Sequence, residues 1–120
     1  MATMQNSLTA VLERNAILTG EFATEPYEVA WAREARWFIR ILDLRGTETH
    51  LEAKTQISPD GLRWCDLDES KISLREPGLT SRPVREFGGW LRLKGVVSGG
   101  GKATKDGAGA KVMIYLVLKS

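Results

Sequence analysis

Apolar and polar residues alternate with a period of two along several parts of this chain, which is the spacing of side chains on a half-buried β-strand. The clearest case runs over residues 51–58 and leads into a Ser-Pro-Asp-Gly turn at residues 58–61. The proline presets φ for such a turn, and Gly61 accepts a positive φ without steric cost. A Trp-Cys pair at residues 64–65 then begins another short strand. The pattern predicts a β-hairpin.

The same reasoning predicts other strands, separated by turns rich in glycine and proline. Residues 8–19 are expected to hold one or two short strands, and residues 20–26 a connection. Residues 90–97 alternate strictly, with leucines on one face and cationic residues on the other. Turns are expected at 45–47 and 76–78, a glycine-rich loop over 98–109, and further short strands over 71–75 and 110–119.

Residues 27–45 fit two structures. At helical spacing their apolar residues form a stripe, and Pro26 suits the first position of a helix. As strands, residues 27–31 and 35–41 each alternate, and the second places Phe38 between two arginines on its outer face. The run Trp37-Phe-Ile-Arg-Ile-Leu42 favours a strand. We therefore predict two strands, with a helix over residues 27–36 as the alternative.

The last predicted strand is apolar on both faces. One face carries Val112, Ile114, Leu116 and Leu118, and the other carries Met113, Tyr115 and Val117. A strand of this kind is covered on both sides. One cover is the core, and the other must be the N-terminal segment, a long loop or another subunit. We expect Met113, Tyr115 and Val117 to form an interface with a protein neighbour.

About eight or nine short strands with turns between them predict an all-β fold, an antiparallel β-sandwich of jelly-roll-like form. With 120 residues and a mass of 13.3 kDa, the chain is long enough to bury one core. We expect a flexible N-terminal arm over residues 1–7 that reaches a neighbour, followed by a single β-sandwich domain over residues 8–120.

Composition limits the compartment and the partners. The single cysteine, Cys65, cannot form an internal disulfide, which argues against a secreted disulfide scaffold. Residues 1–7 lack the basic and apolar regions of a signal peptide, so we expect cytoplasmic synthesis, no secretion by a signal peptide and no membrane partner. Residues 1–69 carry seven Lys/Arg and twelve Asp/Glu, whereas residues 70–120 carry ten and three. These opposite charges are expected to pair within the fold or between subunits.

Candidate catalytic chemistry is sparse. His50, the only histidine, and Cys65 lie on the strands that flank the hairpin turn, but nothing indicates an oxyanion hole beside them. Metal-ligand spacings are absent, although acidic residues cluster near the hairpin at Asp60, Asp66, Asp68 and Glu69. The run Gly99-Gly-Gly-Lys-Ala103 lacks the Ser/Thr and the helix of a phosphate loop. We predict no enzyme, no metal and no cofactor.

Aromatic and basic residues suggest two binding alternatives. Trp31, Trp64 and Trp90 are candidates for stacking on sugar rings, and Trp64, directly after the hairpin, is the one expected to be partly exposed. Basic residues near Trp90 in the sequence would suit single-stranded nucleic acid: Arg82, Arg85, Arg92, Lys94, Lys102 and Lys105. The pI of 8.8 falls short of the value expected for a strongly basic domain, which disfavours nucleic acid as a partner.

Three motifs occur in order before the apolar C-terminal strand: Leu42-Asp-Leu-Arg-Gly46, Gln56-Ile-Ser-Pro-Asp-Gly-Leu-Arg-Trp64 and Glu86-Phe-Gly-Gly-Trp-Leu-Arg-Leu93. With this order, residues 27–118 resemble small β-sandwich virion structural proteins of tailed bacteriophages. The hairpin is also similar to those of discoidin-like and carbohydrate-binding sandwiches. Residues 68–86 and 98–109 depart from the compact pattern. The resemblance implies a fold-defining role for Ser58, Pro59, Asp60, Gly61, Trp64, Phe87, Gly88, Leu91 and Arg92.

The resemblance further implies a non-enzymatic structural or assembly protein that self-associates or decorates a larger shell. We expect a homo-oligomer that is made in the cytoplasm and resides in a virion or another assembled particle. The alternative is a carbohydrate-binding module that recognises a glycan through exposed tryptophan.

Overall fold

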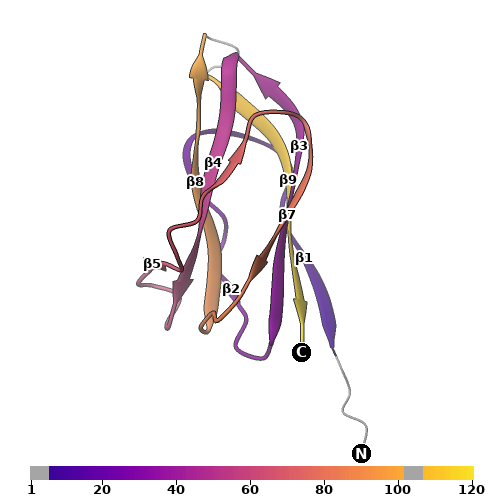
Figure 1. Cartoon of the computed structure of the whole chain (residues 1–120), viewed down its shortest axis with the longest axis vertical. Coiled ribbons are helices and arrows are strands. Elements are labelled where there is room, and N and C mark those ends of the chain that lie inside the picture. Colours follow the sequence, from indigo (N-terminus) through magenta and orange to yellow (C-terminus); the bar gives the residue numbers. More distant parts are fainter. Residues whose placement is uncertain (1–5, 102–106) are drawn as a thin grey trace, which may run out of the picture.

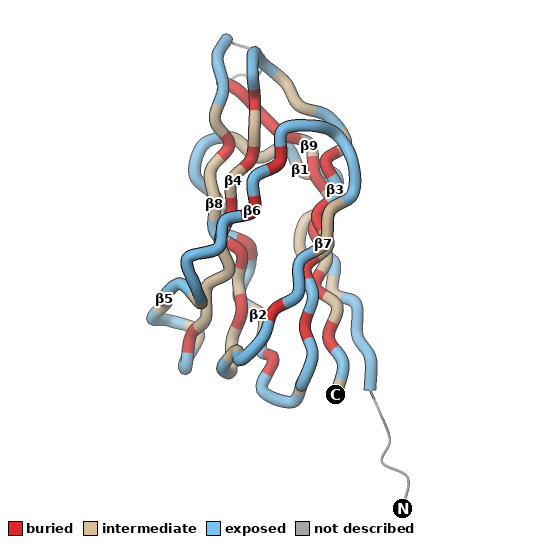
Figure 2. The backbone as a smooth tube through the Cα atoms, in the orientation of Figure 1, coloured by how far each residue is buried: buried red, intermediate tan, exposed pale blue. Residues whose placement is uncertain are grey.

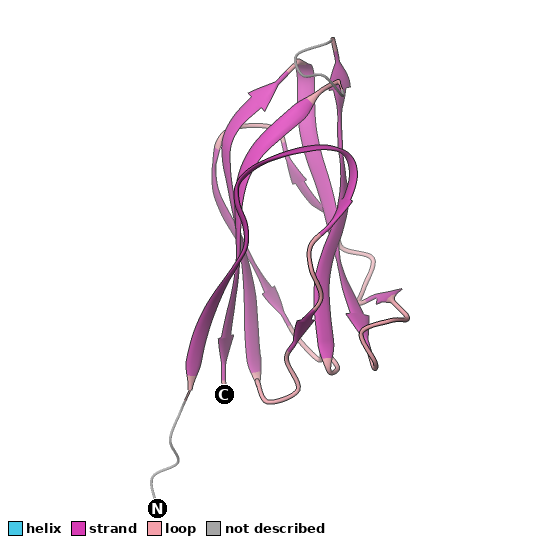
Figure 3. Ribbon diagram, turned by 180° about the vertical axis from the view of Figure 1, so that it is seen from behind, coloured by secondary structure: helices cyan, strands magenta, loops and turns pink. Residues whose placement is uncertain are grey.

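The computed structural model describes residues 6–101 and 107–120, which form nine β-strands and no α-helix (Figure 3). All their strand pairings are antiparallel. The predicted all-β antiparallel fold of eight or nine strands is therefore confirmed. The strands are β1 (Ser7–Ala23), β2 (Tyr27–Glu28), β3 (Glu34–Arg45), β4 (Thr47–Ser58), β5 (Cys65–Asp66), β6 (Ile72–Leu74), β7 (Gly78–Val84), β8 (Trp90–Gly100) and β9 (Gly109–Lys119).

One curled sheet folds into two layers (Figure 1). The hydrogen-bonded order is β5-β4-β8-β1-β9-β3-β7, with β2 added to β8 and β6 added to β4. We call β9, β3, β7 and the first part of β1 the β9 layer. The β4 layer consists of β4, β8, the short strands β2, β5 and β6, and the last part of β1. Because the order ends at β5 and β7, no strand pairing among the described residues closes the side where β6 and β7 lie.

β1 connects the layers because it belongs to both. Residues 7–19 pair with β9, and residues 20–23 pair with β8. Two β-bulges interrupt the first part, and Gly20 has a φ of 59° where the strand changes partner. Bulges bend a strand and increase its twist, which allows a single strand to cross between layers.

This long strand differs from the prediction in two places. The expected connection over residues 20–26 is wrong for residues 20–23, which are paired. β1 also begins at Ser7, which pairs with Lys119, so the strand starts inside the predicted arm over residues 1–7. Residues 1–5 lie outside the described residues.

Alternate side chains of both layers fill the core (Figure 2). Trp37 of β3 is fully buried, and its indole Nε1 donates a hydrogen bond of 2.9 Å to Thr55 Oγ1 of β4. This bond joins the two layers and satisfies the one polar atom of the ring. β9 supplies the alternate residues that its sequence predicts, all of them without exposed surface: Ala110, Val112, Ile114, Leu116 and Leu118.

Residues 27–36 are not helical. β2 is two residues long and pairs Tyr27 with Leu91 of β8. The chain then turns, with the Ala32 N–H donating to the Val29 carbonyl at 3.0 Å, and β3 begins at Glu34. The two-strand interpretation is confirmed over the helix, although the first strand stops before Trp31.

The predicted hairpin is confirmed. β4 ends at Ser58, and β5 returns beside it with Cys65 paired to Ile57. Gly61 has a φ of 78°, and a Cβ on it would lie 3.2 Å from the ring of Trp90. Both the turn and the packing therefore require glycine at position 61.

The remaining strands match the prediction in part. β6 lies within the expected strand at 71–75, and β8 and β9 lie where alternation placed them. β7 was not predicted, and it pairs with β3 although Val84 is its one buried residue. β8 extends to Gly100 into the expected glycine-rich loop, of which residues 102–106 lie outside the described residues.

Candidate functional site

The side of β9 that faces away from the core carries the three predicted interface residues. Met113, Tyr115 and Val117 are half-buried. In the strand register Tyr115 lies between Val11 of β1 and Phe38 of β3. We call the apolar residues on this side of the β9 layer the apolar face: Val11, Ile17, Phe38, Leu79, Met113, Tyr115 and Val117.

Several side chains of the apolar face are open to solvent. Leu79 is 64% exposed, Ile17 is 45% exposed and Val11 is 38% exposed. A shallow hollow of about 450 Å³ lies among Phe38, Tyr115 and their neighbours, with Arg40 on its lining. A continuous exposed apolar patch of this kind is typical of a protein-binding surface. The three predicted residues thus share one face, and their role as an interface stays a prediction.

Charged residues lie at both ends of the apolar face. The register pairs Lys111 with Asp43 at one end and Lys119 with Glu34 at the other. Among the described ion pairs within 4.0 Å, Asp43 is engaged by Arg45 at 3.1 Å, and none includes the two lysines or Glu34. Each end therefore holds one acid and one base on neighbouring strands.

The β1 edge of the β9 layer is less suited to a partner than the face of that layer. Residues 7–19 of β1 form this edge, which the two bulges interrupt. Between the bulges Asn15 has a φ of 51°, and its backbone N–H donates to Met113 Sδ at 3.2 Å. Burial, and secondarily the charge of Glu25, raises the pKa of Glu13 at the same place. Bulges and charges on an edge strand oppose pairing with another strand.

The outer face of the β4 layer is polar and internally connected. Lys54 Nζ lies 3.5 Å from Asp66 Oδ2 and 4.0 Å from Glu69 Oε2. Gln56 Nε2 donates to Asp66 Oδ1 at 2.9 Å, and Arg92 Nε donates to Gln56 Oε1 at 2.8 Å. The Gln56 amide, followed by the Lys54 charge, holds the pKa of Asp66 below its usual value. These side chains satisfy one another without an outside partner.

The hairpin turn has its own polar network. Asp60 Oδ1 accepts the backbone N–H groups of Leu62 and Arg63 at 2.8 and 2.9 Å. Ser58 Oγ accepts the N–H of Gly61 at 2.8 Å. The Arg63 and Leu62 N–H groups favour the ionised carboxylate and lower the pKa of Asp60 to about 2. These contacts give Asp60 a structural role in the turn.

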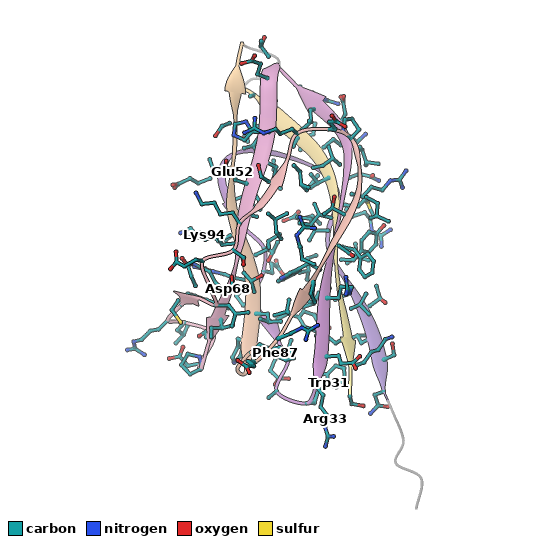
Figure 4. All side chains as sticks on the ribbon, in the orientation of Figure 1. Trp31, Arg33, Glu52, Asp68, Phe87 and Lys94 are labelled. Atoms are coloured by element: carbon teal, nitrogen blue, oxygen red, sulfur yellow. The ribbon has the colours of Figure 1, made fainter. Side chains whose placement is uncertain are left out.

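The tryptophans differ from one another in exposure. The guanidinium of Arg92 lies 4.4 Å from the ring centre of Trp64, which is half-buried. Trp90 is also half-buried, against Gly61. Trp31 is the most exposed tryptophan at 39%, and the half-burial of Trp64 agrees with its expected partial exposure. Figure 4 shows Trp31 at the end of the molecule, near Arg33.

Structure separates the candidate catalytic residues. Cys65 pairs with Ile57 whereas His50 pairs with Ser98, so roughly 23 Å of strand β4 separates the two positions. His50 Nε2 lies 3.7 Å from Glu52 Oε1. Within residues 6–101 and 107–120, no three His, Cys, Asp or Glu side chains are grouped to hold a metal. The same residues include no helix long and apolar enough to cross a membrane.

Basic residues are also rearranged by the fold. Arg92 and Lys94 lie on β8, whereas Arg82 lies on β7 of the other layer, and Lys102 and Lys105 fall outside the described residues. All ion pairs within 4.0 Å in the described part of the chain join residues of the acidic half to one another. None of these pairs links the two oppositely charged halves.

The chain has the fold of a protein encoded by a prophage. It superposes on the crystal structure of the SPBc2 prophage-derived protein YomS with a TM-score of 0.60 and 13% sequence identity, over 100% of this chain and 98% of that one. At this identity the similarity establishes the fold. The sequence matches no family model and no curated protein.

Proposed function

We propose that this chain is a non-enzymatic structural protein that assembles with a second copy of itself through the apolar face. The observation that carries the proposal is the exposure of Val11, Ile17 and Leu79 beside Phe38 and Tyr115 on one side of the β9 layer. Burial of such surface is the main favourable term in protein association. The bulged edge of β1 favours stacking of faces over pairing of edges.

The size of the face is sufficient for a dimer. Four strands spaced about 4.8 Å apart, each contributing some eight steps of about 3.3 Å, give roughly 500 Å² of flat area per copy. A face-to-face pair then buries on the order of 1,000 Å² or more, which is where specific interfaces begin.

Charge complementarity favours a second copy as the occupant. A twofold axis parallel to the strands, between β9 and β3, places β9 of each copy over β3 of the other. Lys111 then faces the partner's Asp43, Lys119 faces the partner's Glu34, and Tyr115 meets the partner's Phe38. Each lysine thus gains a carboxylate across the interface. Two arginines lie inside the face, Arg36 beside Val117 and Arg40 beside Met113. Arg36 donates to Ser81 Oγ at 2.8 Å within the chain, and the Tyr115 hydroxyl of the second copy would supply an acceptor for Arg40.

The fold of YomS supports a phage context for this assembly role, because that protein is prophage-derived and the two chains superpose over nearly their full lengths. The protein would be made in the cytoplasm and would act in an assembled particle. Binding of this protein to a larger shell would be a second step. That step would use either the apolar face or the outer face of the β4 layer.

Light scattering coupled to size-exclusion chromatography tests the proposal. The wild-type chain should elute with the mass of a dimer at about 100 μM, which is consistent with micromolar affinity. Met113→Lys/Tyr115→Lys should elute as a folded monomer. The matched control Val96→Lys/Ser98→Lys changes the outward side of β8 and should leave the dimer intact. A wild-type monomer at every concentration contradicts the proposal.

A mixing experiment tests the geometry. Lys111→Glu and Asp43→Lys each place like charges opposite one another in a homodimer, so each variant alone should dissociate more readily than wild type. A mixture of the two variants restores both opposite-charge contacts and should recover the dimer. If the mixture stays as weak as its components, β9 does not lie over β3 of the partner.

The carbohydrate-binding alternative depends on Trp31, whose ring is the most exposed of the four tryptophans. Quenching or a spectral shift of tryptophan fluorescence with a glycan, lost in Trp31→Ala, would favour it over self-assembly.

A further inference from the structure

β6 and β7 lie on opposite sides of the open side of the sandwich (Figure 2). A cleft lies between these two segments. The cleft has a volume of about 450 Å³. Thr55 and Ile72 contribute to its lining from the β4 layer, and Pro83 contributes from β7. None of these residues belongs to the apolar face, although Pro83 also lines a second hollow together with Phe38 and Val117 of that face.

Three cationic side chains from separate segments converge on this cleft. Lys71 precedes β6, Arg82 lies in β7 and Arg85 follows β7. The lining holds one carboxylate, Asp68, whose Oδ1 accepts the backbone N–H of Ser70 at 2.8 Å. Among the described ion pairs within 4.0 Å, none involves any of the three cations.

This arrangement creates a positive field in a partly enclosed space. The lining carries three positive charges and one negative charge, a net charge of +2. Charges of one sign inside a cleft with low-dielectric walls attract a ligand of opposite sign more strongly than the same charges spread over a surface.

We infer that this cleft binds a phosphate group. A phosphate monoester carries roughly −1.5 to −2 charges at pH 7, which matches the net charge of the lining better than a single carboxylate does. A guanidinium group binds phosphate oxygens through two parallel N–H donors. The cleft has two guanidinium groups, those of Arg82 and Arg85.

The surroundings of Arg85 indicate how a longer ligand would continue. Arg85 and Pro83 also line a second hollow of about 560 Å³, together with Arg33 and Arg36. Glu34 and Glu86 lie on the same lining and reduce its positive charge. The phosphate is therefore borne either by a small phosphorylated molecule in the first cleft or by a single nucleic-acid strand that spans both.

Isothermal titration calorimetry at 150 mM salt tests the inference with two probes, pyrophosphate and a ten-residue oligothymidylate. Both should bind the wild-type chain, and Arg82→Ala/Arg85→Ala should weaken binding by about tenfold or more, as expected for loss of charge-assisted hydrogen bonds. Arg14→Ala/Arg75→Ala removes the same net charge from exposed residues outside the cleft and should change binding by less than about twofold. Circular dichroism verifies that both variants are folded.

The two probes distinguish the sources of the phosphate. Comparable affinities indicate a small phosphorylated molecule, whereas much tighter binding of the oligonucleotide that also falls in Arg33→Ala indicates a nucleic-acid strand. Equal losses in the two double variants would show that binding follows net charge alone and would overturn the inference. Absence of binding by both probes at millimolar concentration would also overturn it. Either result leaves the dimer test unchanged.

Discussion

The outer faces of the two layers belong to one curled sheet but differ in how their side chains are satisfied. On the β4 layer, Lys54, Gln56 and Arg92 are joined to neighbours through ion pairs and hydrogen bonds. On the β9 layer, the half-buried Phe38 and Tyr115 lie side by side, with Arg36 and Arg40 on either side of Phe38 and further charges at the ends. The network on the β4 layer is connected within one chain, whereas burial of the apolar face against another surface would be favourable.

This comparison explains why the same strand pairing supports two roles. Outward positions on β8 and β9 alternate equally with core positions, so neither face is required by the fold. The residues placed there are therefore free to be polar on one side and apolar on the other.

The largest expected effect on stability comes from replacing Trp37, the residue that joins the layers. Trp37→Ala should lower the free energy of unfolding by about 3–5 kcal/mol, because it leaves a large cavity in the core. Urea denaturation followed by circular dichroism measures the change. Thr55→Val keeps the ring and removes its acceptor, and should cost only about 1–3 kcal/mol. Equal costs in the two variants would show that the hydrogen bond, not the ring volume, holds the layers together.

A second change separates association from stability. Tyr115→Ala should weaken the dimer by about tenfold or more, since a central aromatic residue of an interface is truncated. Sedimentation equilibrium measures the dimer affinity, and Gln56→Ala on the opposite face serves as the control with unchanged affinity. A Tyr115→Ala dimer as tight as wild type would move the interface away from the apolar face.

A third change tests the polar face. Arg92→Ala removes the cation above Trp64 and the bond to Gln56, and should lower the free energy of unfolding by about 1–2 kcal/mol. Thermal denaturation measures the loss, and the mass in solution should not change. Arg92→Lys retains the charge without the planar fork and should fall between Arg92→Ala and wild type. Dissociation of the dimer in Arg92→Ala would contradict the separation of the two faces.

The smallest expected effect is the loss of stability at acid pH. The pKa of Asp60 is lowered from 3.8 to about 2 by its hydrogen bonds. Its contribution to stability is therefore present above about pH 4 and is lost as the pH falls toward 2. The amide resonances of Leu62 and Arg63 should shift over this range, before the core unfolds. In Asp60→Asn, which has no such titration, a shift of the same size would assign the acid response to another group.

The sequence was sufficient where a strand follows strict alternation. β9 and the hairpin at Gly61 were predicted because each side chain has one role, in the core or outside it. β7 was missed because it is an edge strand with a single buried residue, Val84, so its pairing with β3 is tertiary in origin. β1 was divided because its bulges shift the phase of alternation between Val11 and Ala16.

The candidate sites show the same limit. Met113, Tyr115 and Val117 were identified from one strand, because a doubly apolar strand is visible in the sequence. The cleft was not foreseen, because Lys71, Arg82 and Arg85 belong to segments that meet only after β6 and β7 take opposite sides of the opening. Residues that converge from separate layers leave no periodic pattern.

The partner change within β1 also determines how the molecule can open. On one side the layers share a continuous hydrogen-bonded strand, whereas on the other no strand pairing among the described residues joins β6 to β7. Amide hydrogens of β6 and β7 should therefore exchange with solvent before those of β9, whose strand is paired on both sides. Local opening would widen the entrance between these two strands while the shared side stays closed, so access to the interior is asymmetric.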